Sequence, residues 1–482
     1  MIRKWLVMVA GWLVVSVVVC AVAPAAGAIP QEKPQEKPQE KPQDKPPAYT
    51  LPEYNAYQAA AKEPNPQQRI RLLDDFVAKY PSSALLVYAY QTYYTTYNEL
   101  KNYPKTIEYA DRLLTFGDKL DSGTQLQALY IRTLAFNYSF NEKAADAKEQ
   151  ATRARAAALA GLKVLGELKK PEGVSDDQFE QNKKGPTALF NYTAGLASLQ
   201  LGQSAAAELT GIVKQRPAGM SDAQYDQRKA ELRAEANKQL QTAIGSFKAA
   251  LAANPNDAVT YFRLGIAYLQ MEPSQAMDGF WALARSVALK GPGEAQVRTY
   301  LHNRLANYQQ TGCDKLVNDQ MNELIALAGS SAERPATFKI PSAAELQKMR
   351  EDPSSNFIAD LQAGGEKAKL MWLATCGLEF PEAGGKVIEV SGSDSVVLKL
   401  FYAPTAEAME AGTVANMEVK VEGQPEAKRI QVGDGVRFSG TLASYDPAPF
   451  MLHWEKAKVN KEDIPDQPGK RPPKRPAKKS GR

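Results

Sequence analysis

A long stretch of apolar residues spaced three and four apart constrains this chain more than any other feature. The pattern runs from Tyr49 to about Gly365, where Ala, Leu, Gln, Lys and Glu dominate the composition. This spacing puts the apolar side chains on one face of a helix, which has to be buried against other helices. We therefore expect a mainly α fold, with helical repeats over residues 49–340 and connecting helices over residues 341–384.

One part of this stretch, from Ala243 to Arg285, repeats itself. A pattern of small and aromatic residues ending in proline is followed by a Tyr-x-x-Leu-Gly-x-x-Tyr run, and the first pattern restarts 33 residues after Ala243. The repeat-defining residues are Ala243, Phe247, Pro255, Tyr261, Leu264, Gly265, Tyr268, Ala276 and Phe280. They resemble the tetratricopeptide repeat family, whose period is about 34 residues. The resemblance implies pairs of antiparallel helices, with Gly265 and Ala276 where helices cross.

Weaker copies of the pattern occur earlier in the chain. Tyr90, Tyr93, Tyr94 and Tyr97 occupy the defining positions of another first helix, and residues 66–81 fit an earlier second helix. The resemblance implies an α-solenoid whose first helices line a concave, partner-binding face. The residues that the register would direct to this face are Tyr88, Gln91, Thr95, Tyr192, Leu196, Phe262, Ile266 and Leu269.

Tyrosines are concentrated in one short segment. Seven of the 21 tyrosines lie between Tyr88 and Tyr109. Two interpretations stay open: these rings fill the space between neighbouring repeats, or they line a groove for a partner. The second is possible in physical terms because tyrosine offers a large amphipathic surface at low entropic cost.

A second repeated segment in the sequence indicates where one helix ends and the next begins. The segment that begins at Pro171 matches the segment that begins at Pro217, 46 residues later. In each, a Pro-x-Gly turn precedes a serine that stands three residues before a glutamine, the spacing of a capping box. Ser342 stands in the same way before Glu345. These positions are expected to begin helices.

Strands replace helices from about Gly385. The expected strands cover residues 386–390, 396–402, 417–421, 435–442 and 450–459, where apolar and polar residues alternate. Gly440 is expected to mark a bulge or a barrel bend. This β-rich domain, residues 385–464, is similar to a small five-stranded barrel of the oligonucleotide/oligosaccharide-binding (OB) kind. A generic five-stranded barrel or sandwich is the alternative.

The N-terminal residues are typical of export. Arg3 and Lys4 precede an uncharged apolar run, residues 5–23, and small residues follow up to Ala28. Residues 1–28 are therefore a bacterial secretory signal, cleaved after Ala28, or an anchor retained through residues 5–23. Both alternatives place the body in the periplasm or cell envelope. Residues 29–48 repeat Gln-Glu-Lys-Pro, which predicts a disordered linker because proline recurs at every fourth position.

The net charge of +5 belongs to the ends of the chain. Residues 465–482 hold seven basic residues and one acid, with prolines that predict disorder, whereas the body is slightly acidic. The tail residues expected to bind anions are Lys470, Arg471, Lys474, Arg475, Lys478 and Lys479. The charge therefore does not indicate a nucleic-acid-binding fold.

Histidine and cysteine are too scarce for most catalytic or metal sites. The histidines are His302, expected at a surface or between helices, and His453, expected in a strand with one hydrogen bond. Cys313 and Cys376 either pair in an oxidising compartment or stay as buried thiols. The sequence holds no zincin, Cys-x-x-Cys, Gly-x-Ser-x-Gly or Walker motif. We expect no catalysis, metal or cofactor.

Two main hypotheses follow for function. The first is a non-catalytic exported scaffold or adaptor that binds a protein or peptide on the concave face. The second is a cell-envelope module that binds anionic polymer, lipid or glycan through the β domain and basic tail, with strong salt dependence. Nucleic acid is not an expected partner, since export removes it. An enzyme with a dispersed site is a third alternative, which a pocket of perturbed carboxylates would favour.

Overall fold

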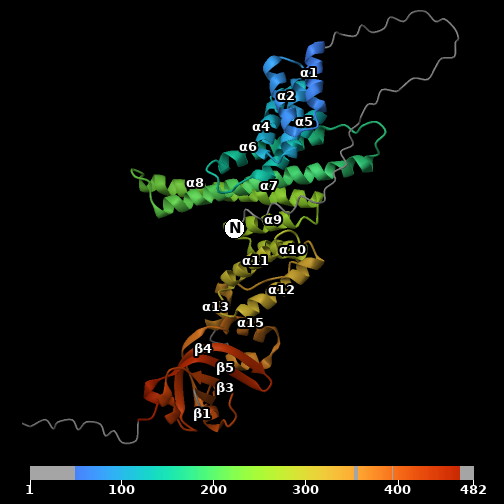
Figure 1. Cartoon of the computed structure of the whole chain (residues 1–482). Coiled ribbons are helices and arrows are strands. Elements are labelled where there is room, and N and C mark those ends of the chain that lie inside the picture. The colour runs from blue at the N-terminus through green and yellow to red at the C-terminus, as the bar shows by residue number, and fades with distance from the viewer. Residues whose placement is uncertain (1–48, 352–356, 393–394, 467–482) are drawn as a thin grey trace, which may run out of the picture. The chain divides into compact units, whose positions relative to one another are not determined.

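The computed structural model describes residues 49–351, 357–392 and 395–466. Helices occupy most of the described chain and lead to a closed five-stranded barrel at its C-terminal side (Figure 1). This confirms the expected fold class, mainly α with a small β-barrel. The predicted signal segment, the linker and the basic residues of the tail lie outside the described residues.

The chain divides into two compact units. Described residues 49–298 and 328–334 form the first unit, and residues 299–327 with those from 335 onward form the second. The helices of the first unit are α1 (Leu51–Lys62), α2 (Pro66–Lys79), α3 (Leu86–Glu99), α4 (Tyr103–Leu114), α5 (Ser122–Ser139), α6 (Ala147–Glu167), α7 (Asp176–Lys214), α8 (Asp222–Ala253), α9 (Ala258–Gln270) and α10 (Ala276–Ala288). The chain passes between the units within α11 (Glu294–Gln309) and α12 (Asp314–Ser330).

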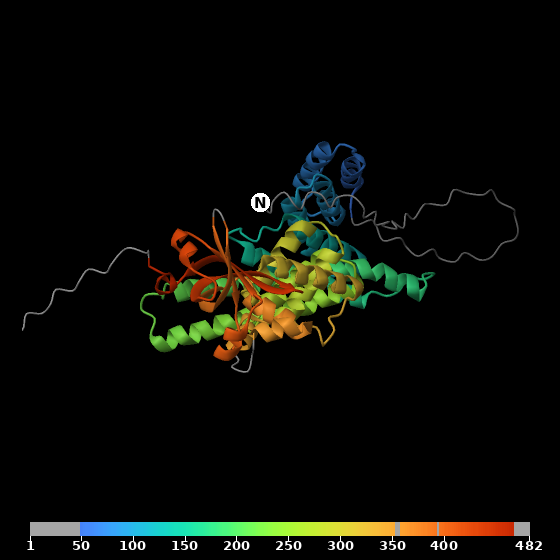
Figure 2. The ribbon, with the colours of Figure 1, turned by 90° about the horizontal axis from the view of Figure 1, so that it is seen from below.

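Consecutive helices of the first unit pack side by side, and glycines set the closest approaches. A β-carbon on Gly265 of α9 would lie 2.7 Å from Leu283 Cγ of α10, and one on Gly161 of α6 would meet the ring of Phe190. Helices α7 and α8 form a long antiparallel pair whose ends extend past the shorter helices of this unit (Figures 1 and 2). Both helices begin directly after the serines, Ser175 and Ser221, that the matching segments marked as helix starts.

The serine caps begin the expected helices. Ser221 and Gln224 form a reciprocal capping box at α8, and Ser342 and Glu345 do so at α13 (Ala343–Glu351). At α7 the Ser175 side chain accepts a hydrogen bond from the backbone N–H of its glutamine, but that glutamine side chain donates to Asn182 instead of reaching back. The α7 cap is therefore one-sided.

Besides most of α11 and α12, the described residues of the second unit form three short helices before the barrel and one between its strands. These are α13, α14 (Phe357–Ala363), α15 (Gly365–Thr375) and α16 (Ala406–Ala411). The strands are β1 (Glu379–Ser391), β2 (Val396–Phe401), β3 (Met417–Val421), β4 (Gly435–Pro447) and β5 (Phe450–Val459). The order around the barrel is β1-β2-β3-β5-β4, in which β3 and β5 are parallel and the other pairs are antiparallel.

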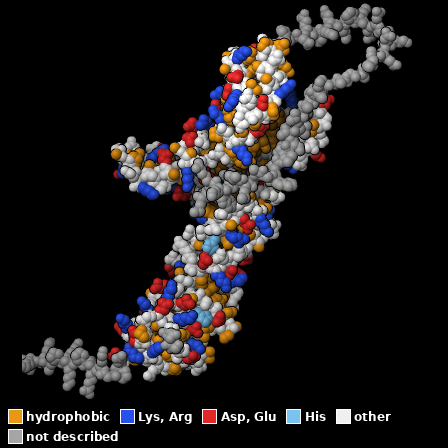
Figure 3. Space-filling model, in the orientation of Figure 1, with side chains coloured by type: hydrophobic (Ala, Val, Ile, Leu, Met, Phe, Trp, Pro, Cys, Tyr) orange, Lys and Arg blue, Asp and Glu red, His pale blue; other side chains and the backbone are white. Residues whose placement is uncertain are grey.

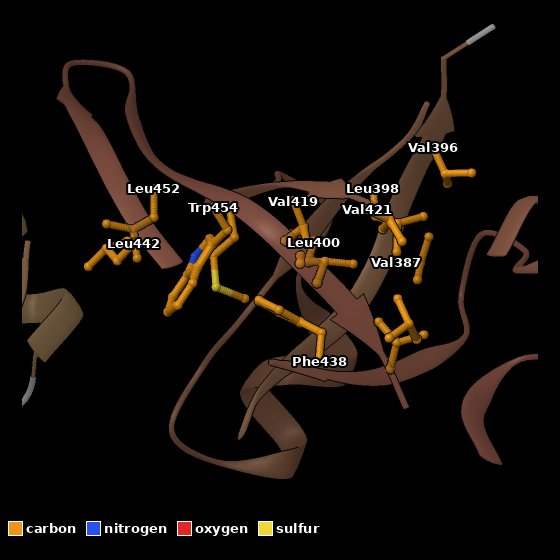
Figure 4. Close-up of a cluster of buried hydrophobic side chains, with 14 of the residues drawn as sticks. Val387, Val396, Leu398, Leu400, Val419, Val421, Phe438, Leu442, Leu452 and Trp454 are labelled. Carbon is orange, nitrogen blue, oxygen red and sulfur yellow. The ribbon is translucent and has the colours of Figure 1, made fainter. Parts of the chain in front are cut away.

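Side chains alternate between the inside and the outside of the barrel along each strand, and those that point inward form the barrel core. Branched aliphatic residues lie on both sides of the Trp454 and Phe438 rings (Figure 4). Trp454 lies edge-on to Phe438 and to Phe380, with ring centroids 5.2 Å apart in both pairs. The register of β4 against β5 shifts between Ser439 and Thr441, across Gly440, which confirms the expected irregularity there. Alternation along the strands thus decides which residues enter the core.

The start of β1 differs from the sequence-based expectation. The strand begins at Glu379 instead of near Lys386, because the Gly384-Gly385 pair lies within the strand and does not break it. Backbone oxygens of the neighbouring strands lie 2.8 Å from where a β-carbon would stand on either glycine. The register also shifts between Phe380 and Ala383, as at a β-bulge. Glycine permits close strand contact here, although the same residues resemble a turn in sequence.

Candidate functional site

A groove lies between α6 and α8, with α7 as its base. Its volume is about 700 Å³. Each helix contributes side chains at spacings of three and four residues, so one stripe from each helix faces the same space. The lining residues are Lys148, Thr152, Arg155, Leu201, Ala205, Glu208, Arg228, Glu231, Leu232, Ala234, Glu235, Lys238 and Gln239.

Small residues bring the helices close enough to form an apolar floor. A β-carbon on Gly202 of α7 would lie 3.1 Å from Leu240 Cγ and 3.2 Å from Ala236 O of α8. The floor of the groove includes Ala205 and Leu232, which are 5% and 4% exposed. This floor can accept an apolar side chain, whereas its walls are charged.

In one part of the groove, which we call its outer part, the charged residues Glu208, Arg228 and Glu231 are paired with one another. Arg228 of α8 forms ion pairs with Glu208 of α7 and with Glu231 of its own helix. Figure 3 shows basic and acidic side chains interspersed over the exposed surface of the α7–α8 pair. Compensated pairs of this kind on exposed helices contribute little to stability.

A second part of the groove, which we call its inner part, is lined by Lys148, Arg155 and Lys238, and these basic groups form no ion pair with a carboxylate of the described residues. Arg155 Nη1 donates to Gln239 Oε1 at 2.6 Å, and Gln239 Nε2 donates to Glu235 Oε1 at 2.7 Å. Gln239 is 7% exposed, so a neutral buried amide supports the guanidinium. Within the described chain, Lys148 and Lys238 form no ion pair. Three basic residues, Lys148, Arg155 and Lys238, thus accompany one carboxylate, Glu235, in this part of the lining, which leaves it with a net positive charge.

The eight residues expected on the concave face do not line this groove. Tyr88 is 51% exposed, and Gln91, Thr95, Tyr192, Phe262 and Leu269 are half-buried. Leu196 and Ile266 are 5% and 9% exposed. Leu196 packs with Phe136 and Ala154, because α5 and α6 cover that side of α7. The structure therefore does not present Leu196 and Ile266 as surface residues for a partner.

Tyr192 and Phe262, two of the eight residues expected on the concave face, lie next to an ion pair between Arg263 and Glu142 that the sequence did not predict. Arg263, next to Phe262, donates to Glu142 Oε1 at 2.6 Å across 121 positions of sequence. Burial raises the pKa of the nearby Tyr192 hydroxyl, and the positive charge of Arg263 opposes that shift. The contact connects α9 to the turn after α5, so its evident effect is to hold the two in place.

The tyrosine cluster mostly fills the space between helices. Tyr93 of α3 stacks on Tyr109 of α4 with centroids 4.0 Å apart, and Tyr97 stacks on the same ring at 5.4 Å. The Tyr93 hydroxyl donates to Asp74 Oδ1 of α2 at 2.6 Å. These contacts match the packing interpretation. Tyr88 is the exception, since half of it is exposed.

The outer face of the barrel carries a row of paired charges across its strands. Lys399 Nζ donates to Glu389 Oε2 at 2.8 Å. His453 lies between two carboxylates, with Nδ1 at 3.3 Å from Glu418 Oε1 and Nε2 at 3.0 Å from Asp446 Oδ2. His453 thus has two partners where one was expected. Three carboxylates and two basic side chains make up this row.

The histidines and cysteines that the sequence analysis considered do not come together in a catalytic or metal-binding site among the described residues. His302 Nε2 lies 2.9 Å from Asp314 Oδ1, and the second histidine belongs to the barrel. In the part of the chain that the structure describes, no group of three His, Cys, Asp or Glu residues is placed to hold a metal ion. Cys313 and Cys376 form a disulfide. The pairing alternative for the thiols is therefore the one the structure adopts.

Comparison with known proteins adds no assignment. The sequence matches no protein-family model and no curated protein. Among the helices of the described residues, none is long and apolar enough to cross a membrane, and the apolar segment 5–23 lies outside them.

Proposed function

We propose that this chain is a non-catalytic exported scaffold that binds a protein or peptide partner through its helical unit. The groove over α7 carries this proposal, because three helices combine an apolar floor with charged walls there. Grooves between helices are a recurring way to bind a peptide segment. The half-exposed Tyr88 and Phe262 keep the expected concave face as a second location for the partner.

The assignment of the helices to tetratricopeptide-like repeats is part of the proposal. Its support is the burial of the motif residues, except the exposed Pro255, and their contacts. Gly265 of α9 approaches α10 at Leu283, and Gly279 of α10 approaches Leu269 of α9 in return. Ala243 and Phe247 of α8 are fully buried. These are the places where the motif requires small or aromatic residues.

Site-specific photo-crosslinking in the native organism tests the proposal. Benzoylphenylalanine would replace Thr152 in the groove wall, Phe262 on the expected face, or Leu159, which is 52% exposed and outside the groove. We expect a discrete adduct from Thr152 or Phe262 and none from Leu159. Adducts from all three positions, or from none of them, would contradict partner binding by the helical unit.

Export is proposed from the N-terminal segment and is supported by the disulfide. Disulfides persist in the periplasm and outside the cell and are rare in the cytosol. The test is alkylation of the thiols in unbroken cells, with and without prior reduction. We expect Cys313 and Cys376 to resist alkylation until a reductant is added. Two freely alkylated thiols in untreated cells would contradict an oxidising location.

The alternative function, anion or glycan binding by the β domain and tail, stays a proposal that rests on the tail sequence. Its six basic positions lie outside the described residues. Deletion of residues 465–482 would abolish salt-dependent retention in the cell envelope if this function is correct. Unchanged retention across salt concentrations would contradict it.

A further inference from the structure

We propose that the groove over α7 binds an acidic segment of the partner, with a carboxylate at the Lys148–Arg155–Lys238 end and an apolar side chain on the floor. This inference rests on the proposed scaffold function and adds the chemistry of its partner. The charge at the inner end of the groove identifies the partner as acidic.

Three basic side chains line that end, and none has a carboxylate partner among the described residues. Arg155 is bonded to the neutral amide of Gln239, and Lys148 and Lys238 form no ion pair. Hydrogen bonds from such groups to a carboxylate are stronger than those to a neutral amide. An incoming Asp or Glu side chain would therefore gain contacts that the free protein does not make for itself.

The position of Lys148 also argues for a role outside helix stability. Lys148 lies in the first turn of α6, where the helix dipole favours acidic residues and disfavours basic ones. Glu149 is the neighbouring residue that satisfies this preference. A positive charge at this end of α6 adds to the positive potential of the helix terminus, and both would attract an anion in the groove.

The carboxylates in the groove make a uniformly negative polymer an unsuitable ligand. Glu208, Glu231 and Glu235 line it together with the basic residues. A phosphate polymer would place negative charge beside all three carboxylates, which is unfavourable. A protein segment can instead place its acidic residue at the basic end and apolar or basic residues further along. The arrangement of charge therefore favours a protein segment with mixed character.

The experiment measures fluorescence anisotropy of a labelled peptide with a repeated Glu-Leu-Ala sequence, bound to the chain from residue 29 to 482. A Lys-Leu-Ala peptide is the charge-reversed probe. The double variant Lys148→Glu/Lys238→Glu is expected to weaken binding of the acidic peptide at least about tenfold, because like charges face each other. Since Glu at position 148 suits the helix dipole, we expect α6 to stay folded, which circular dichroism checks.

The matched control is Lys163→Glu/Lys169→Glu. Both lysines are exposed, lie on α6 or the turn after it, and are outside the groove. This variant changes the net charge equally, so an affinity within about twofold of the wild type is expected if binding is local. Equal weakening by both double variants would overturn the assignment to this groove.

Two further outcomes separate the inference from the scaffold function. Tight binding of the Lys-Leu-Ala peptide, or displacement of the acidic peptide by polyphosphate at equal charge, would overturn the acidic-segment assignment. Photo-crosslinks from Thr152 or Phe262 would in that case still support a scaffold with a different partner. Loss of those crosslinks, with peptide binding unchanged, would instead contradict the scaffold function alone.

Discussion

Adjacent tyrosines in α3 have different surroundings for their hydroxyl groups. Tyr93 and Tyr94 are both buried, at 1% and 0% exposure. The Tyr93 hydroxyl donates to Asp74, whereas the Tyr94 hydroxyl has no hydrogen-bond partner among the residues that the structure describes. Tyr94 also stands where the repeat motif has a small residue. A buried hydroxyl without a partner costs about 1–3 kcal/mol of desolvation.

Substitution of Tyr94 by phenylalanine is therefore expected to stabilise the first unit by about 1 kcal/mol, since it removes that hydroxyl and keeps the ring. Tyr93→Phe is the matched contrast and is expected to destabilise, because it leaves Asp74 without this donor. Urea unfolding followed by far-UV circular dichroism measures both changes. A loss of stability in Tyr94→Phe similar to that in Tyr93→Phe would show that the Tyr94 hydroxyl is satisfied in solution.

Buried tyrosines also predict how stability depends on pH. Burial raises the pKa of Tyr109 to about 12, and burial raises the pKa of Tyr94 above its ordinary value as well. The unfolded chain therefore loses these protons first, so the folded state is favoured fully below about pH 10 and less as pH rises through about 12. We expect the free energy of unfolding to fall between about pH 9 and pH 11.

The measurement is urea unfolding at both pH values, with tyrosinate absorbance to follow ionisation. Tyr109→Phe is the matched variant and should show a smaller fall than the wild type. An identical fall in both proteins would mean that other groups cause the loss.

At the scale of elements, a turn of the same conformation occurs before α7 and again after it. Residues Lys170–Asp176 and Arg216–Asp222 both close on an ion pair of 2.6 Å. The middle glycines have φ values of 81° and 80°, a conformation that favours glycine. Such turns are decided within a few residues, so a matching sequence produces a matching structure at both ends of α7. This is why the helix starts could be predicted from spacing alone.

Helix crossings test the repeat assignment at this same scale. Gly265→Ala is expected to destabilise the first unit by about 1–3 kcal/mol, because the new methyl group would overlap Leu283 and approach the backbone oxygen of Gly279. Gly245→Ala in α8 is the control, since no atom of another described residue beyond its own helix turn lies within 4 Å of the added β-carbon. Alanine there should stabilise by about 0.5–1 kcal/mol. Opposite signs are thus expected in thermal unfolding, and equal signs would contradict a close α9–α10 crossing.

At the scale of the whole molecule, the disulfide organises the second unit. Cys313 precedes α12 and Cys376 follows α15, 63 positions apart in sequence. Each cysteine adjoins a glycine, and a β-carbon on Gly312 would lie 2.5 Å from Gly377 O. The backbone segments cross too closely for any other residue. The bond therefore connects the turn after α11 to the entry of the barrel.

Reduction of this disulfide is expected to destabilise the second unit and leave the first unchanged. For a loop of this length the chain-entropy model gives about 4 kcal/mol. Differential scanning calorimetry with and without reductant should show one transition move to lower temperature. In a Cys313→Ala/Cys376→Ala variant the reductant should have no further effect. A shift of both transitions by reductant would contradict a contribution confined to the second unit.

Local features of the candidate sites were predictable, and long-range features were not. The serine caps and the presence of five strands follow from residue spacing, although β1 begins earlier and β4 ends later than expected, and the burial of Gly265 follows from the motif. The groove was missed because its lining comes from three helices that span residues 148–239. A stripe of Leu201, Ala205 and Glu208 is visible in α7, but nothing in the sequence says which neighbours leave it uncovered.

By itself, the sequence determined the mainly helical character, the change to strands and the positions where α7, α8 and α13 begin. Each of these depends on hydrogen bonds and side-chain alternation within a few residues. Only the tertiary structure decided that Leu196 and Ile266 are covered, that Cys313 meets Cys376, and that Lys148 and Lys238 line one groove. Those outcomes depend on how separate helices pack, and packing is a property of contacts between residues far apart in the chain.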